Sequence, residues 1–135
     1  MRACSARLTS RPRRSSGGIP SLFGHLAVTG PDNQPQVNPM WALWDGEFLR
    51  FTTTRDRRKH RSVVADPAVS FSVNDPEQPY RYLEVRGVVE RVEPDPQGEF
   101  FDVLARRYGL DYERPVGDAE RRVILVVRPT RTTSQ

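Results

Sequence analysis

The chain has 135 residues, of which 36% are hydrophobic and 28% charged, a composition that fits one compact domain and excludes collagen-like or wholly disordered proteins. One cysteine and two histidines are too few for a disulfide framework or a His/Cys metal site. No apolar run approaches the roughly 20 residues of a membrane span, so we expect no membrane partner. The single cysteine favours a cytoplasmic protein, in a reducing compartment.

The positive charge is concentrated near the N-terminus. The net charge is +4, yet residues 1–20 hold five arginines and no acid, which leaves 16 basic and 17 acidic residues in the remainder. A nearly neutral domain lacks the electrostatic footprint of a protein that binds a phosphate backbone, so we expect no nucleic-acid partner. Residues 1–21 are predicted to form a disordered Arg/Ser-rich tail or to reflect a misplaced start, with a targeting segment or a nucleic-acid-binding arm as the alternatives.

Apolar runs separated by turn formers predict strands in the first half of the remaining domain, residues 22–135. These strands cover residues 22–29, 36–44 and 48–53. An Asp45-Gly46 turn between the last two indicates a hairpin. Pro39 lacks a backbone N–H, so the second strand is expected at a sheet edge or a bulge.

The second half is predicted to contain a short helix and three further strands. The helix covers residues 57–65 and ends at Asp66, because the following proline disfavours helix there. The strands cover residues 69–73, 80–92 and 122–128. Gly87 indicates a bulge or a close backbone approach, and the last strand is apolar enough to be buried on both faces.

A second helix is predicted between the last two strands. Asp95 is its expected N-cap and Pro96 its first residue, and Gly109 ends it. Its apolar face is expected to contain Phe100, Phe101, Val103, Leu104 and Tyr108. Six strands in short hairpin-like steps with two helices predict a mainly β fold, a small antiparallel β-barrel with peripheral α-helices.

A candidate anion site lies where the third strand gives way to the short helix. Its residues are Thr52, Thr53, Thr54, Arg57, Arg58 and Lys59, and Lys59 is the only lysine of the chain. Hydroxyl donors, guanidinium forks, an ammonium group and the free N–H groups of a helix start are groups that bind phosphate. The pattern favours phosphate binding, and a solvated run of charges is the alternative.

Two further groups suit a flat, ring-shaped ligand. The first alternates amide and apolar side chains and consists of Gln36, Val37, Asn38, Pro39 and Met40. The second is the pair Tyr80 and Tyr82, which suits ring stacking or a subunit interface. An ordinary edge strand is the alternative for the first group, and a structural role is the alternative for the second.

Taken in order, these segments resemble the pyridoxamine 5'-phosphate oxidase-like split β-barrel superfamily, and within it the F420-dependent branch (flavin/deazaflavin oxidoreductase group B). The resemblance is carried by residues 24–27, 35–41, 52–59, 66–67, 79–87 and 121–125. It implies a six-stranded antiparallel split barrel of the FMN-binding type. It also implies a homodimer with two cofactor sites at the subunit interface.

The same resemblance implies roles for the candidate residues. Lys59 and Arg57 would hold the cofactor phosphate, assisted by the hydroxyls of Thr52 and Thr53. Residues 36–40 would lie along the tricyclic ring of the cofactor. The other subunit would supply the two tyrosines named above.

Three departures from the family pattern stand out. The usual amphipathic helix before the first strand is replaced by the Arg-rich tail. Ser62 stands where asparagine is usual, which is expected to loosen a capping contact. Residues 128–131 lack the Arg-x-His signature of true pyridoxamine phosphate oxidases, which argues against vitamin B6 oxidation.

The resemblance implies an F420H2-dependent oxidoreductase that transfers hydride from a deazaflavin to a small electron-poor acceptor. An FMN-binding oxidoreductase is the alternative within the same fold, because the array Arg55, Arg57, Arg58 and Arg61 suits either cofactor. A non-catalytic cofactor-binding protein is the third hypothesis. The acceptor, a small molecule, is not identified by the sequence, because substrate pockets are built from variable loops.

Overall fold

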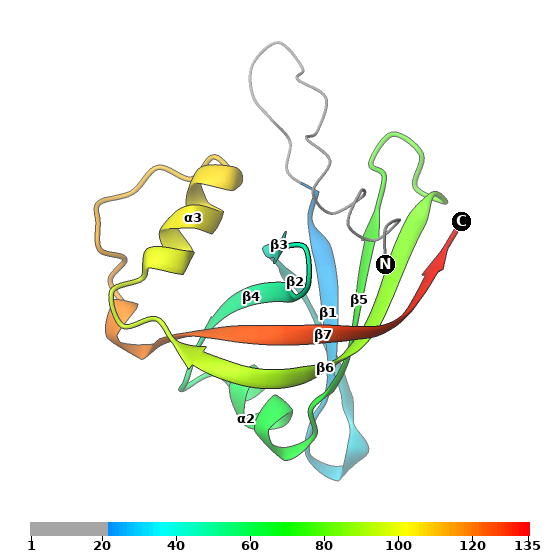
Figure 1. Ribbon diagram of the computed structural model, residues 1–135, viewed down its shortest axis with the longest axis horizontal. Helices are drawn as coiled ribbons and strands as arrows, with labels where there is room; N and C mark the ends of the chain where they lie inside the picture. Colours follow the sequence, from blue (N-terminus) through cyan, green and yellow to red (C-terminus); the bar gives the residue numbers. More distant parts are fainter. Residues whose placement is uncertain (1–21) are drawn as a thin grey trace.

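The computed structural model describes residues 22–135, and its strands form one antiparallel sheet that curls into a split barrel (Figure 1). The strands are β1 (Gly24–Thr29), β2 (Pro35–Met40), β3 (Ala42–Trp44), β4 (Leu49–Thr54), β5 (Ala68–Asn74), β6 (Tyr82–Pro94) and β7 (Arg122–Ser134). Their order in the sheet is β2-β1-β5-β6-β7-β4-β3. The predicted mainly β barrel with peripheral helices is confirmed. The tail predicted for residues 1–21 lies outside the described residues.

The described residues contain seven strands rather than the predicted six, because the run at 36–44 is divided at Trp41. β2 pairs with β1, whereas β3 pairs with β4 at the other end of the sheet. The two outermost strands are therefore neighbours in sequence, and the sheet has to curl to bring its edges together at Trp41. Pro39 lies in β2 and hence at a sheet edge, as predicted.

Two predicted backbone features are confirmed. In the β3–β4 hairpin, Gly46 has a φ of +103°, and the Asp45 carboxylate accepts a hydrogen bond of 2.7 Å from the N–H of Phe48. In β6 the register with β7 shifts at Gly87. A Cβ on Gly87 would lie 2.6 Å from the carbonyl oxygen of Arg128, so the two backbones approach there too closely for a side chain.

The barrel interior contains one hydrophobic core. Phe51 of β4 and Phe71 of β5 meet there edge to face, with ring centroids 5.1 Å apart. The largest aliphatic side chains buried with them are Leu26, Leu49, Leu83 and Leu125. Residues 123–127 of β7 are all buried, which confirms the prediction that this strand is covered on both faces.

The helix α3 (Glu99–Arg107) begins later than predicted. Its N-cap is Gly98, in the left-handed conformation, and not Asp95. Residues 95–98 instead form a turn that is closed by a 2.9 Å hydrogen bond from the Gly98 N–H to the Asp95 carbonyl. The Asp95 carboxylate still accepts from the first turn of the helix, at 3.3 Å from the N–H groups of both Phe100 and Phe101. The sequence therefore indicated the correct capping side chain but the wrong starting residue.

One side of α3 covers an end of the barrel (Figure 1). The buried residues of this helix are Phe101, Leu104 and Ala105. Val103 is 40% exposed, so its predicted place on the apolar face is wrong. The Tyr108 ring stacks on Trp41 at 5.2 Å, and its hydroxyl accepts a 3.1 Å hydrogen bond from the N–H of Ala42. These contacts hold the end of α3 against the point where the chain changes strand partners.

The helix α2 (Arg58–Ala65) is confirmed in position and type, and it ends at Asp66 as predicted. Val63 faces inward and joins the barrel core. Ser62 is only 3% exposed, and among residues 22–135 its hydroxyl has no hydrogen-bond partner. The expectation that a serine at this position loosens a capping contact stays a prediction.

We expect Ser62→Ala to leave the free energy of unfolding unchanged or to raise it by about 1 kcal/mol, because alanine removes a buried hydroxyl that no group of the described residues satisfies. Urea unfolding of the two proteins measures the difference. Thr54→Val is the matched control: the Thr54 hydroxyl is also buried but is hydrogen-bonded to Asp56, so its removal is expected to cost about 1 kcal/mol. A clear loss of stability in Ser62→Ala would contradict this interpretation.

Two structural features are absent from residues 22–135. In this range no group of three His, Cys, Asp or Glu side chains is placed to hold a metal ion. No helix of this range has the length and hydrophobicity needed to cross a lipid bilayer.

Candidate cofactor site

The first residues of α2 face the edge strand β2, and together they line a cavity of about 610 Å³, here called the β2–α2 groove. Its lining residues are Gln36, Val37, Asn38, Pro39, Met40, Arg57, Arg58 and Lys59. All of them belong to the candidate residues selected from the sequence, so the structure brings together the predicted ring-binding stretch and the predicted phosphate-binding cations. Among the strands of residues 22–135, β2 pairs only with β1, so no other described strand occupies the backbone groups along its other side.

Lys59 is the most unusual group of the groove. Its side chain is half-buried, and its ammonium donates to the sulfur of Met40 at 3.1 Å. It forms no ion pair with any acid of residues 22–135. Burial lowers the pKa of Lys59, and the nearby positive charge of Arg57 lowers it further. An anion in the groove would remove this electrostatic penalty.

Two arginines add to the positive charge of the groove. Arg57 is the N-cap residue of α2, and Arg58 is its first residue; both are exposed. Within the described part of the chain, neither has a carboxylate in ion-pair contact. A helix start with three adjacent cations and free N–H groups is chemically suited to phosphate.

The three threonines do not line the groove. Thr52, Thr53 and Thr54 are buried in β4, where they pair with β7. Thr52 accepts a hydrogen bond of 3.4 Å from Arg122. The hydroxyl of Thr54 is the main cause that holds the pKa of Asp56 below its usual value. Any contact between these hydroxyls and a phosphate remains a prediction.

The two tyrosines also lie outside the groove lining. Tyr80 lies in the β5–β6 connection and is 88% exposed. Tyr82 begins β6 and pairs with Asn74 of β5. Their expected place beside a cofactor of a second subunit remains a prediction.

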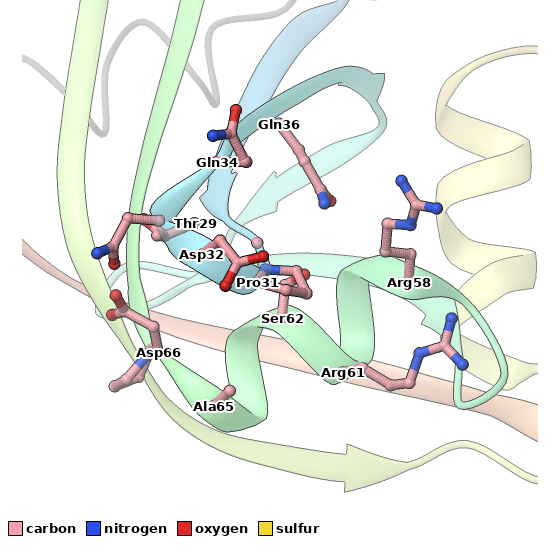
Figure 2. A pocket seen from close by; sticks show the side chains of 13 residues that line it. Thr29, Pro31, Asp32, Gln34, Gln36, Arg58, Arg61, Ser62, Ala65 and Asp66 are labelled. Atoms are coloured by element: carbon pink, nitrogen blue, oxygen red, sulfur yellow. The ribbon is translucent and has the colours of Figure 1, made fainter.

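A larger cavity, of about 960 Å³, adjoins the groove and shares Gln36 and Arg58 with it. It lies between α2 and the turn at residues 30–34 (Figure 2). Arg58 and Arg61 extend from the first part of α2, whereas Asp32 and Asp66 lie toward the end of the helix. This turn was not predicted to be part of a site. Its turn formers were the only local signal, and they predict a change of direction, not a cavity wall.

The curled antiparallel sheet with its two helices defines the split-barrel class of proteins. The profile of the pyridoxamine 5'-phosphate oxidase family matches residues 20–135, and the chain belongs to this family. No curated protein matches it.

Solved structures agree with this assignment. An F420 reductase is 51% identical, with 96% of each chain covered and a TM-score of 0.85. The conserved hypothetical protein Rv2991 from Mycobacterium tuberculosis is 27% identical over 99% of this chain and 83% of its own, with a TM-score of 0.71. General Stress Protein 26 from Bacillus anthracis, at 18% identity, covers 97% of this chain and 92% of its own with a TM-score of 0.65, and it shares the fold.

Proposed function

We propose that this protein is an F420H2-dependent oxidoreductase that reduces a small electron-poor acceptor at cofactor sites shared between two subunits. The observation that carries the proposal is the half-buried Lys59 ammonium, which lies beside an open edge strand with no acid to pair with among the described residues. The 51% identity to a protein named F420 reductase supports the choice of cofactor.

Each part of the groove has a distinct task in this proposal. Lys59 and Arg57 bind the phosphate, and residues 36–40 orient the ring through side chains and the free edge of β2. The bound deazaflavin supplies the hydride. The second subunit covers the ring with the region of Tyr80, which is 88% exposed in the single chain, and so excludes water. The chain itself need provide no nucleophile.

The adjoining cavity favours F420 over FMN. FMN ends at its phosphate, whereas F420 continues beyond it into a polyglutamate. The larger cavity continues from the groove at Arg58 and contains Arg61, and neither arginine is ion-paired within the described residues. These cations suit an acidic tail, whereas Asp32 and Asp66, which line the same cavity toward the end of α2, do not.

Equilibrium titration with F420 and with FMN, side by side, tests the proposal. We expect F420 to bind more tightly, and Arg61→Ala to weaken F420 binding by about three- to tenfold while leaving FMN binding unchanged. Tighter binding of FMN would contradict the proposal and indicate an FMN-dependent oxidoreductase of the same fold. Binding of neither cofactor, or a strict monomer in sedimentation analysis, would refute it.

Cofactor affinity is expected to fall at alkaline pH. In the free protein the pKa of Lys59 is lowered by burial and by Arg57. A bound phosphate raises it again, so between these two pKa values binding takes up a proton. Affinity is therefore highest below the pKa of the free protein and decreases as the pH rises through it.

Calorimetric titration in buffers with different ionisation enthalpies measures this proton uptake. Lys59→Arg is the control, because a guanidinium stays charged over the same pH range. Its affinity is expected to be independent of pH there. Equal pH dependence in both proteins would assign the effect to another group.

A further inference from the structure

Met40 occupies a particular position in the groove. It is the last residue of β2, lies opposite Gly24 of β1 and packs against the barrel core. It also lines the groove, and its sulfur is the hydrogen-bond partner of the Lys59 ammonium at 3.1 Å. It is the only methionine in residues 22–135. One side chain thus connects the core, the groove and the phosphate-binding cation.

The chemistry of this contact depends on the oxidation state of the sulfur. A thioether is a weak acceptor, so it leaves the Lys59 ammonium available to a stronger acceptor such as a phosphate oxygen. A sulfoxide carries a strongly polar oxygen and no longer suits an apolar contact. At the position of Met40, this oxygen would compete with phosphate for Lys59, and the side chain would leave its place against the core.

We propose that Met40 is a reversible oxidation site that lowers the affinity of the groove for its cofactor. This inference rests on the proposed function of the groove. The oxidant is a peroxide: a sulfur lone pair attacks one peroxide oxygen, the O–O bond breaks as the S–O bond forms, and the proton on the new hydroxysulfonium passes to the departing hydroxide. Sulfur is oxidised by two electrons, and hydrogen peroxide is reduced to water. A methionine sulfoxide reductase restores the thioether.

The test compares three states of the full-length protein: untreated, oxidised with hydrogen peroxide, and oxidised then treated with methionine sulfoxide reductase. Peptide mass spectrometry records the addition of one oxygen to Met40, and titration with F420 and with FMN gives the dissociation constants. We expect oxidation to weaken binding about tenfold and the reductase to restore it. Thermal unfolding of each state verifies that the fold persists.

Met40→Leu is the matched control, because it removes the sulfur but keeps Met1 and Cys4, the other oxidisable sulfur sites. We expect treatment with peroxide to leave the cofactor affinity of this variant unchanged, whatever that affinity is before treatment. The inference is overturned if Met40 stays unoxidised while the chain folds normally, if the oxidised protein binds as tightly as the untreated one, or if Met40→Leu loses affinity equally. Failure of the untreated protein to bind either cofactor would refute the proposed function instead.

Discussion

Replacing Lys59 with alanine is expected to weaken F420 binding by about 10- to 150-fold, equivalent to about 1.5–3 kcal/mol. The substitution removes the only ammonium group of the groove, and this group lies half-buried without an acidic partner in residues 22–135. A cation that is already partly desolvated has less hydration to lose when a phosphate arrives. Its contribution to binding is therefore expected to be near the upper end for a charge-assisted hydrogen bond.

Fluorescence or calorimetric titration of the variant measures the effect. Arg55→Ala is the matched control: Arg55 lies four residues away in sequence, but its guanidinium donates to the Glu120 carbonyl at 3.0 Å and does not line the groove. We expect this control to change the affinity by less than about twofold, since exposed charges contribute little. Equal losses in the two variants would indicate a general electrostatic effect, and an unchanged dissociation constant in Lys59→Ala would refute the phosphate assignment.

Phe71→Ala is expected to lower the free energy of unfolding by about 3–5 kcal/mol, the range for truncation of a buried aromatic ring. Phe71 is 2% exposed and packs edge to face against Phe51 in the middle of the barrel. Its ring also fills the space above Gly24, where an added Cβ would overlap it. The barrel cannot close this space easily, because β1 and β5 are already paired across it.

Urea unfolding, with the slope of the transition compared between proteins, measures the loss. Phe23→Ala is the control, because the Phe23 side chain is 57% exposed and contacts Tyr108 at the barrel end. It is expected to cost about 1 kcal/mol or less. Because β1 pairs with both β5 and β2, Phe71→Ala is also expected to weaken cofactor binding through the groove wall. A decrease in the free energy of unfolding of Phe71→Ala as small as that of Phe23→Ala would contradict tight packing of the core around Phe71.

Local signals in the sequence were sufficient for much of the groove. Lys59 is the only lysine of the chain, and the adjacent helix start is visible in the sequence around it. Pro39 indicated an edge strand because its missing N–H is a local property. The bulge at Gly87 and the Asp45-Gly46 turn were predictable for the same reason: each depends on the backbone freedom of one or two residues.

Tertiary structure alone decided how these parts meet. Nothing local marks Trp41 as the residue where the chain changes strand partners, because that change follows from closure of the whole sheet. The contact between Met40 and Lys59 joins residues 19 positions apart in the sequence. The larger cavity lies between a turn and α2, although β2, β3 and β4 stand between these two elements in the chain. Residue type and spacing predicted which side chains would carry the chemistry. Long-range strand pairing determined which of them share a groove, since periodicity encodes the burial of a residue but not the identity of its neighbours.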